Sequence, residues 1–91
     1  MKIEKKAAAG TMESNDVFIV VEPCEKGVTI DLSSPVEKQY GPQIIETIRQ
    51  VLSELDIDGA CITAVDRGAL DCTLRARTQT AVSRALRGDA Q

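Results

Sequence analysis

Residues 10–22 read GTMESNDVFIVVE, a short polar segment that runs directly into an apolar stretch. Residues 17–21 are all apolar, so residues 17–22 predict a strand with apolar side chains on both faces, as a central strand has. The preceding residues 13–16 predict a turn, because Ser, Asn and Asp bond back to the backbone and Asn tolerates left-handed dihedral angles. Residues 2–12 predict a further strand. If the two strands pair, Ser14 lies at the tip of a hairpin.

The middle of the chain predicts one more strand and a helix. Val28, Ile30 and Leu32 alternate with polar residues, which is the period of a half-buried strand. Residues 33–42 then form a polar connection. Residues 42–55 carry apolar side chains at helical spacing, with the proline at position 42 placed in the first turn of the helix.

The last third of the chain predicts a strand over residues 60–65, a turn over residues 66–68 and a final helix. Leu70 and Leu74 alternate with polar residues as a strand would. The helix is favoured because the segment is long and begins with Asp71, an acidic residue that suits a helix start. One helical face would then hold Leu70, Leu74, Ala81, Val82, Ala85 and Leu86.

These elements predict an α+β fold in the order β-β-β-α-β-α. A small, mainly antiparallel sheet with both helices packed on one face satisfies this order. The 91 residues fit one domain, 1–91, with flexible ends at about residues 1–3 and 88–91. Phe18 and Tyr40 are the only aromatic residues, so the core is expected to be aliphatic.

Composition argues against several classes of partner. The net charge of −3 disfavours binding to phosphate backbones, so no nucleic-acid partner is expected. No apolar run reaches membrane-spanning length and no signal peptide is visible, which predicts a cytoplasmic protein with no membrane association. Cys24, Cys61 and Cys72 lack metal-ligand spacing and are expected to be free thiols, the latter two in the core.

The final segment carries a series of arginines, two of which, Arg77 and Arg84, lie about two helical turns apart on one face. Such a face is usually solvated, with its positive charges favourable near the carboxyl end of the helix. A partner surface is the alternative. The full set is Arg75, Arg77, Arg84 and Arg87.

The chain contains no histidine, which excludes a Ser-His-Asp or Cys-His catalytic arrangement. It also contains neither a Walker loop nor a dinucleotide fingerprint. Ser14 therefore has no imidazole to activate it as a nucleophile. A serine of this kind is better suited to receiving a group from another enzyme and carrying it, so the chain is not expected to be catalytic.

Two separated motifs resemble the acyl carrier protein family of citrate lyase, the gamma chains of that enzyme. Residues 10–17, GTMESNDV, resemble the AGTLESSDV-type segment of the family, and residues 68–77, GALDCTLRAR, resemble its second motif. The pairs EP at 22–23, TA at 80–81 and RA at 84–85 add to the likeness, as does the total length. Met12 and Asn15 depart from the family pattern, but neither removes the hydroxyl of Ser14.

The resemblance implies that Ser14 carries 2'-(5''-phosphoribosyl)-3'-dephospho-CoA through a phosphodiester. The thiol of this group would hold acetyl and citryl thioesters. The implied partners are the alpha subunit, an acyl transferase, the beta subunit, a lyase with its own divalent metal, and the transferase that attaches the prosthetic group. The alpha and beta subunits would together convert citrate to acetate and oxaloacetate, and this chain would contribute tethering rather than catalysis.

Three alternatives stay open. The chain could be the carrier subunit of a malonate decarboxylase-type complex, which uses the same kind of arm, or an unmodified structural adaptor. Ser33 or Ser34 could replace Ser14 as the attachment point. Carriers of fatty-acid synthesis present Asp-Ser-Leu at a helix start, however, and residues 31–33 have these residue types in another order at the end of a predicted strand.

Overall fold

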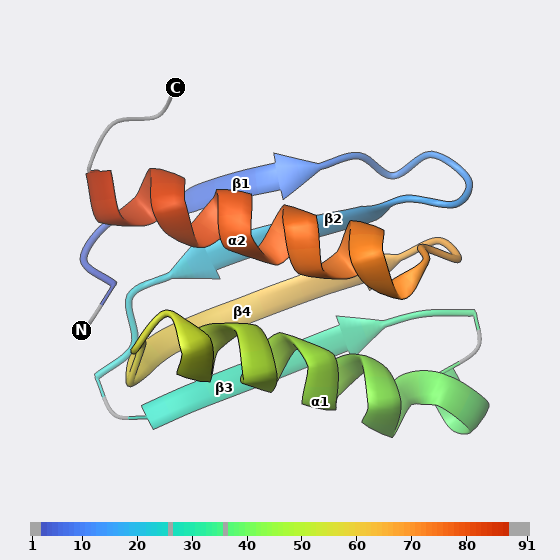
Figure 1. Ribbon diagram of the computed structural model, residues 1–91, viewed down its shortest axis with the longest axis horizontal. Helices are drawn as coiled ribbons and strands as arrows, with labels where there is room; N and C mark the ends of the chain where they lie inside the picture. The colour runs from blue at the N-terminus through green and yellow to red at the C-terminus, as the bar shows by residue number, and fades with distance from the viewer. Residues whose placement is uncertain (1–2, 26, 36, 88–91) are drawn as a thin grey trace.

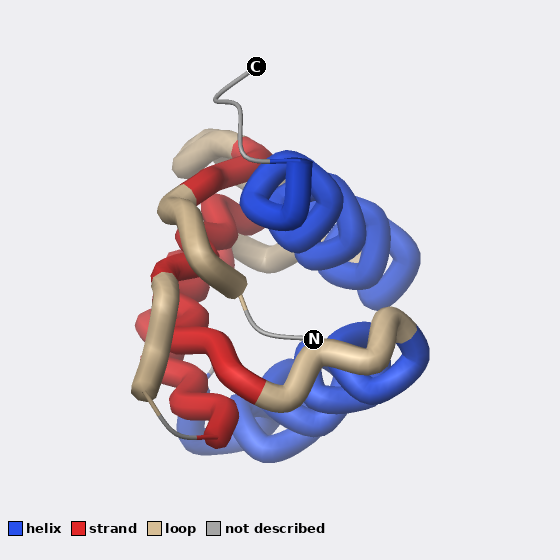
Figure 2. Tube along the Cα trace, turned by 90° about the vertical axis from the view of Figure 1, so that its left-hand side faces the viewer, coloured by secondary structure: helices blue, strands red, loops and turns tan. Residues whose placement is uncertain are grey.

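The computed structural model describes residues 3–25, 27–35 and 37–87, with the side chains of residues 37, 38 and 87 excepted. Four strands form one sheet, and both helices lie on the same face of it (Figures 1 and 2). The α+β prediction and its order of elements are therefore confirmed. The elements are β1 (Ala7–Gly10), β2 (Val17–Glu22), β3 (Gly27–Ser33), α1 (Glu37–Glu54), β4 (Gly59–Asp66) and α2 (Asp71–Arg87).

The sheet has the strand order β1-β2-β4-β3. The β1–β2 and β2–β4 pairs are antiparallel, whereas β3 and β4 are parallel and are joined through α1, as a parallel pair requires a crossover. The strand β2 is internal, as its apolar sequence predicts. Its side chains are alternately buried and half-buried, because the helices cover only one face of the sheet.

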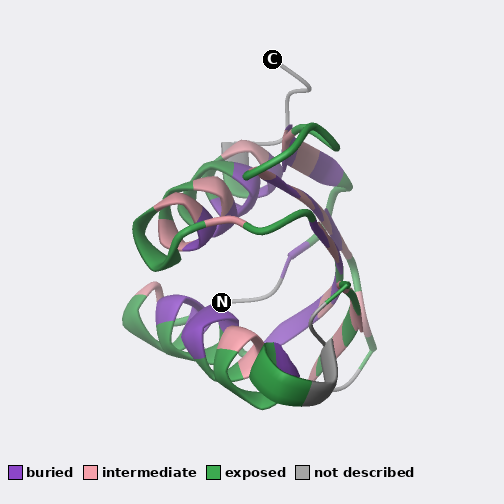
Figure 3. Ribbon diagram, turned by 90° about the vertical axis from the view of Figure 1, so that its right-hand side faces the viewer, coloured by how far each residue is buried: buried purple, intermediate pink, exposed green. Residues whose placement is uncertain are grey.

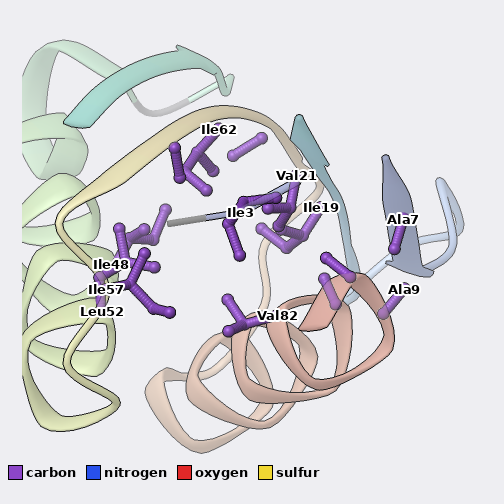
Figure 4. Packing of buried hydrophobic residues seen from close by; sticks show 14 of the residues in the cluster. Ile3, Ala7, Ala9, Ile19, Val21, Ile48, Leu52, Ile57, Ile62 and Val82 are labelled. Atoms are coloured by element: carbon purple, nitrogen blue, oxygen red, sulfur yellow. The ribbon is translucent and has the colours of Figure 1, made fainter. Parts of the chain in front are cut away.

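The core is aliphatic, as expected, and fills the space between the sheet and the helices (Figures 3 and 4). Phe18 is only half-buried and Tyr40 is exposed, so neither aromatic ring belongs to the buried core. The helix α2 packs on β1 and β2, and α1 packs on β3 and α2. The largest fully buried side chains are Ile19, Ile48, Leu52, Ile62, Val17, Val21, Val51, Val82 and Thr78.

Two element boundaries differ from the sequence predictions. The first strand covers only Ala7–Gly10 rather than residues 2–12, since the chain before it does not pair with β2. The helix α1 begins at Glu37, within the predicted polar connection, and Pro42 lies inside it. Glu, Lys and Gln at positions 37–39 are strong helix formers, and the carbonyl that the missing N–H of Pro42 would bond lies in the first turn.

Three predicted core positions are not buried. Leu70 is 70% exposed because it precedes α2 instead of belonging to its apolar face, and Leu86 is 39% exposed. Cys72 is exposed on the first turn of α2. Cys61 is half-buried on β4, where a hydrogen bond with Cys24, together with burial, raises the pKa of its thiol. The fold thus brings together two thiols that are far apart in the sequence.

The beginning of the described chain is fixed to the sheet. Ile3 is buried, and its N–H donates to the carbonyl of Gly59, 3.0 Å away, at the start of β4. The other expected flexible residues, 1–2 and 88–91, lie outside the described residues. Within the described ranges, neither helix is long and apolar enough to cross a membrane.

The close approach of β1 and β2 requires glycine at position 10. Gly10 has φ +95, and a Cβ on it would lie 1.8 Å from the carbonyl oxygen of Val17. We therefore expect Gly10→Ala to lower the free energy of unfolding by at least about 3 kcal/mol, since it adds backbone strain to a clash with main-chain atoms. Urea unfolding measures this loss.

Gly27→Ala is the matched control for that substitution. Gly27 also has a positive φ, of +64, but nothing lies within 4 Å of a Cβ built there. It should lose only about 1–2 kcal/mol, the usual penalty of a left-handed conformation. Equal losses for the two variants would show that the contact between Gly10 and Val17 does not constrain the hairpin.

Candidate functional site

Ser14 occupies the corner of a tight turn between β1 and β2. Residues 11–16, the Ser14 loop, connect the two strands, and the Asp16 N–H donates to the carbonyl of Glu13 at 3.2 Å, which closes a four-residue turn. Asn15 has φ +66, as the third position of such a turn can require, and asparagine tolerates it. Ser14 is exposed, and its hydroxyl engages no hydrogen bond within residues 3–25, 27–35 and 37–87.

The carboxylate of Asp16 holds the two ends of the Ser14 loop together. Its Oδ2 accepts a hydrogen bond from Thr11 Oγ1 at 2.7 Å, and its Oδ1 accepts one from the Val17 N–H at 2.7 Å. Thr11 Oγ1 in turn accepts from the Glu13 N–H at 3.2 Å. The loop that presents Ser14 is therefore braced by its own side chains at both of its ends.

Arg77 of α2 binds the same carboxylate from outside the hairpin. Its Nε lies 3.1 Å from Asp16 Oδ1 and its Nη2 lies 3.0 Å from Oδ2, which is the two-pronged geometry that favours arginine over lysine. The hydrogen bonds from Arg77, followed by those from Thr11 and Val17, hold the pKa of Asp16 well below its usual range. The Ser14 loop is thereby fixed to the helix.

The connection between β4 and α2 supports the other side of the Ser14 loop. The Asn15 N–H donates to the carbonyl of Arg67 at 2.7 Å, and the Arg67 N–H donates to the carbonyl of Asp16 at 2.9 Å. A Cβ placed on Gly68 would lie 3.6 Å from Asn15 Oδ1. These contacts bring together the two sequence motifs, residues 10–17 and 68–77, that the sequence analysis identified separately.

The arginines of α2 are not the free, solvated face that the sequence favours. Besides Arg77, Arg84 donates from Nη1 to the carbonyl of Ala8 on β1 at 2.8 Å. Arg75 forms an ion pair with Glu54 at the end of α1, with 2.7 Å between Nη2 and Oε1. Each of the three therefore ties α2 to another element. The side chain of Arg87 lies outside the described part of the structure.

Ser33 and Ser34, the alternative attachment points, lie at the end of β3 and just after it. Ser33 is exposed. Ser34 is half-buried, and its hydroxyl donates to Asp66 Oδ2 at 2.9 Å. Of the two alternative attachment points, Ser34 has a hydroxyl that is already hydrogen-bonded within the protein, whereas the Ser14 hydroxyl has no such bond within the described residues.

The site exposes one serine side chain on a loop that neighbouring segments hold in place. Within the described residues there is no cluster of three or more Cys, Asp or Glu side chains that could hold a metal ion. Among the ion pairs of the described residues, the one between Arg77 and Asp16 is the only one that reaches the Ser14 loop. The charge of Arg77 is thus already paired. The arrangement holds the backbone at Ser14 in a fixed position with the side chain exposed, and no described carboxylate is hydrogen-bonded to the Ser14 hydroxyl.

Comparison with known proteins agrees with the motifs. A family model described as malonate decarboxylase delta subunit matches residues 4–85. A citrate lyase acyl carrier protein from Streptococcus uberis is 51% identical over 85 residues, covering 93% of this chain and 84% of that protein. One from Oenococcus oeni is 47% identical over 91 residues, covering 100% of this chain and 94% of that protein. The chain belongs to the family of citrate lyase acyl carrier proteins.

A solved structure shares the fold of this chain. A chain in the structure of a Pseudomonas malonate decarboxylase hetero-tetramer in complex with malonate superposes with a TM-score of 0.81. The match covers 93% of this chain and 88% of that chain, at 17% sequence identity. At this identity the likeness concerns the fold alone.

The lowered pKa of Asp16 predicts how the stability of this protein depends on pH. An aspartate whose pKa is lowered on folding stabilises the protein fully above its unfolded pKa, about 3.9, and loses that contribution as the pH falls below it. The melting temperature of the wild type should therefore exceed that of Asp16→Asn by a constant amount above about pH 5, and the difference should shrink below about pH 4. Thermal unfolding followed by circular dichroism measures it.

Glu13→Gln removes a negative charge from the same exposed loop and serves as the control. Its melting temperature should follow that of the wild type across this pH range. A difference between the wild type and Asp16→Asn that persists unchanged to pH 2 would contradict the assigned role of the Asp16 carboxylate.

Removing Arg77 should loosen the Ser14 loop without unfolding the carrier. In Arg77→Ala, we expect amide hydrogen exchange at Asn15 and Asp16 to accelerate several-fold, because the clamp that holds this turn against α2 is gone. Arg84→Ala is the matched control, since Arg84 contacts Ala8 on β1. It should leave the loop amides unchanged, and equal acceleration in both variants would mean that Arg77 acts only through global stability.

Proposed function

We propose that this chain is the acyl carrier subunit of citrate lyase and that Ser14 is the attachment point of its prosthetic group, 2'-(5''-phosphoribosyl)-3'-dephospho-CoA. The observation that carries the proposal is the exposed Ser14 hydroxyl at the corner of a turn whose backbone is held from two sides. The family membership supports it, because the relatives at 47–51% identity are named as acyl carriers of this enzyme.

The residues around Ser14 fit a large anionic substituent. The hydroxyl faces solvent, so a bulky group can be added without displacing any buried side chain. The neighbouring charge of Asp16 is neutralised by Arg77, which reduces the repulsion that a phosphodiester would meet. Arg67, exposed on the adjoining connection, adds a positive charge close to the loop. The chain thus accommodates the group and its negative charge.

The chain would act by positioning. When bound, the group supplies a thiol that holds acetyl and citryl units as thioesters. The Ser14 loop fixes the base of the arm relative to the sheet and α2, so the arm sweeps from a defined point. Tethering raises the local concentration of the acyl unit at each successive active site, which a freely diffusing carrier would not do.

The partners that follow from this role are the alpha acyl transferase and the beta lyase of citrate lyase, together with the enzyme that attaches the arm. The alpha and beta subunits would convert citrate to acetate and oxaloacetate, so the bond-making steps would lie on these larger subunits.

A malonate decarboxylase-type complex is the second candidate. The description of the matching family model and the shared fold with a chain of that decarboxylase favour it. The identities weigh towards citrate lyase, at 51% and 47% for the two named relatives against 17% for the decarboxylase chain. Reconstitution with the large subunits of each enzyme separates the two candidates by which mixture turns over.

Ser14→Ala tests the attachment point. Because the side chain is exposed and has no partner among the described residues, the variant should fold with wild-type stability. Produced together with the attaching enzyme, it should keep the mass of its sequence, whereas the wild type should gain the mass of one prosthetic group. Its citrate cleavage in the reconstituted complex should fall to background.

Ser33→Ala, which removes another exposed serine, is the matched control and should be modified and active as the wild type is. A modified, active Ser14→Ala protein would overturn the attachment point. Native wild-type protein with no added mass would instead favour an unmodified structural adaptor.

A further inference from the structure

A cleft of about 310 Å³ opens beside the Ser14 loop, between the first halves of α1 and α2. The β1–β2 connection, the β4–α2 connection and the starts of both helices all lie at the same end of the molecule (Figure 1). We call this cavity the helix cleft. Its volume is at the lower end of the range for small-molecule sites, about 300–1,000 Å³. Its lining residues include Tyr40, Gln43, Thr47, Asp66, Gly68 and Asp71.

Gly68 connects the helix cleft to the attachment point. It lines the cleft, and it lies against Asn15, whose Oδ1 is 3.6 Å from the position that a Cβ on Gly68 would take. Ser14 is the residue before Asn15. A substituent on the Ser14 hydroxyl therefore begins one residue from the rim of the cleft, and its first rings can reach inside.

The polar lining of the helix cleft selects donors and rejects anions. Asp66 is 3% exposed and is oriented by Ser34 and by the N–H of Ala69. Asp71 accepts from Thr47 Oγ1 at 3.0 Å, which fixes its carboxylate against α1. Carboxylate oxygens have further lone pairs and can accept more hydrogen bonds. Among the side chains that the structure describes, no Lys or Arg lines the cleft, so phosphate groups are unfavourable there whereas N–H donors are favourable.

The remaining walls suit a flat aromatic ring. Tyr40 lines the helix cleft with a half-exposed side chain, and apolar side chains of both helices complete the surface. The side-chain amide of Gln43 can donate and accept at the edge of a ring. A phenol ring beside carboxylates and an amide is a suitable surface for an uncharged heteroaromatic base that carries an amino group.

We propose that the helix cleft holds the adenine nucleoside of the arm that Ser14 carries. This inference rests on the proposed function, because that arm contains an adenine nucleoside between its attachment phosphate and its thiol end. The adenine ring stacks on Tyr40, and its amino group donates to Asp66 or Asp71. The diphosphate leaves through the mouth of the cleft, since the two carboxylates repel it, and the thiol end stays outside.

Docking of the nucleoside changes the geometry of transfer. The pivot of the swinging arm moves from the Ser14 oxygen to the mouth of the helix cleft, and the freely moving part becomes shorter. A shorter flexible tether raises the effective concentration at a site that it can still span. The helix cleft is thus a second, non-covalent anchor for the same group.

Fluorescence of Tyr40 tests the proposal, because the chain has one tyrosine and no tryptophan. Stacking on adenine quenches tyrosine emission. At the millimolar effective concentration of a tethered group, we expect folded holo protein to emit roughly half as much as folded apo protein, or less. In urea, where the cleft is lost, the two forms should emit equally.

A double variant, Tyr40→Phe with Phe18→Tyr, supplies the matched control. It moves the reporter to β2, where residue 18 is half-buried on the face of the sheet that the helices do not cover. Its emission should be the same in the apo and holo forms. A second measurement uses amide chemical shifts, which should change between apo and holo protein at Thr47 and Gly68 as well as in the Ser14 loop.

The outcomes separate this inference from the proposed function. Native protein without the added mass would overturn the proposed function. Protein that carries the adduct on Ser14, but whose Tyr40 emission equals that of the apo form and whose shifts change only within residues 13–16, would overturn the helix cleft assignment alone. Quenching of Tyr40 together with shifts at Thr47 and Gly68 supports the assignment.

Discussion

The fixed position of the Ser14 loop depends on one ion pair, that between Asp16 and Arg77. A turn with an exposed corner and few apolar contacts would ordinarily sample many conformations. Here a single carboxylate accepts hydrogen bonds from Thr11, from the backbone of Val17 and from both prongs of the Arg77 guanidinium. The hairpin is thus fixed to α2 by a contact between two residues that lie 61 positions apart in the sequence. Ser14 is exposed, but the loop that carries it is held in place.

The pattern of apolar residues in the sequence predicts the strands and helices of the fold, but it does not predict where each of them begins and ends. The strand at residues 17–22 follows from its apolar run and α1 follows from the helical spacing of its apolar residues, whereas the prediction of a helix for α2 also rests on the length of the segment and on Asp71. The start of α1 could not be located in this way. The proline at position 42 is a strong local signal for the start of a helix. The residues before it form helix readily, however, and α1 begins earlier, at Glu37. The parallel pairing of β3 with β4 also depends on contacts that no local pattern carries.

The proposed attachment residue can be identified from the sequence, whereas its contacts cannot. Ser14 was identified from the motif around it and the lack of histidine, and the structure places it at an exposed corner. Arg77 was interpreted as part of a solvated helix face, since a charge on a helix gives no sign of which distant carboxylate it meets. The second motif contains a signal from which this contact could have been predicted. Arg77 belongs to the same family pattern as Ser14, which is a reason to expect contact between the two segments, because both are parts of that pattern.

The chain enters and leaves the described fold far from the Ser14 loop. Ile3 is anchored at Gly59, where β4 begins, and β4 ends seven residues later, at Asp66, beside the loop. The helix α2 likewise starts next to the loop and ends at Arg87, about 25 Å along its axis. A fusion partner, an affinity label or a surface linkage at either described end would therefore lie at the end of the molecule opposite Ser14 and leave the surface around this serine uncovered.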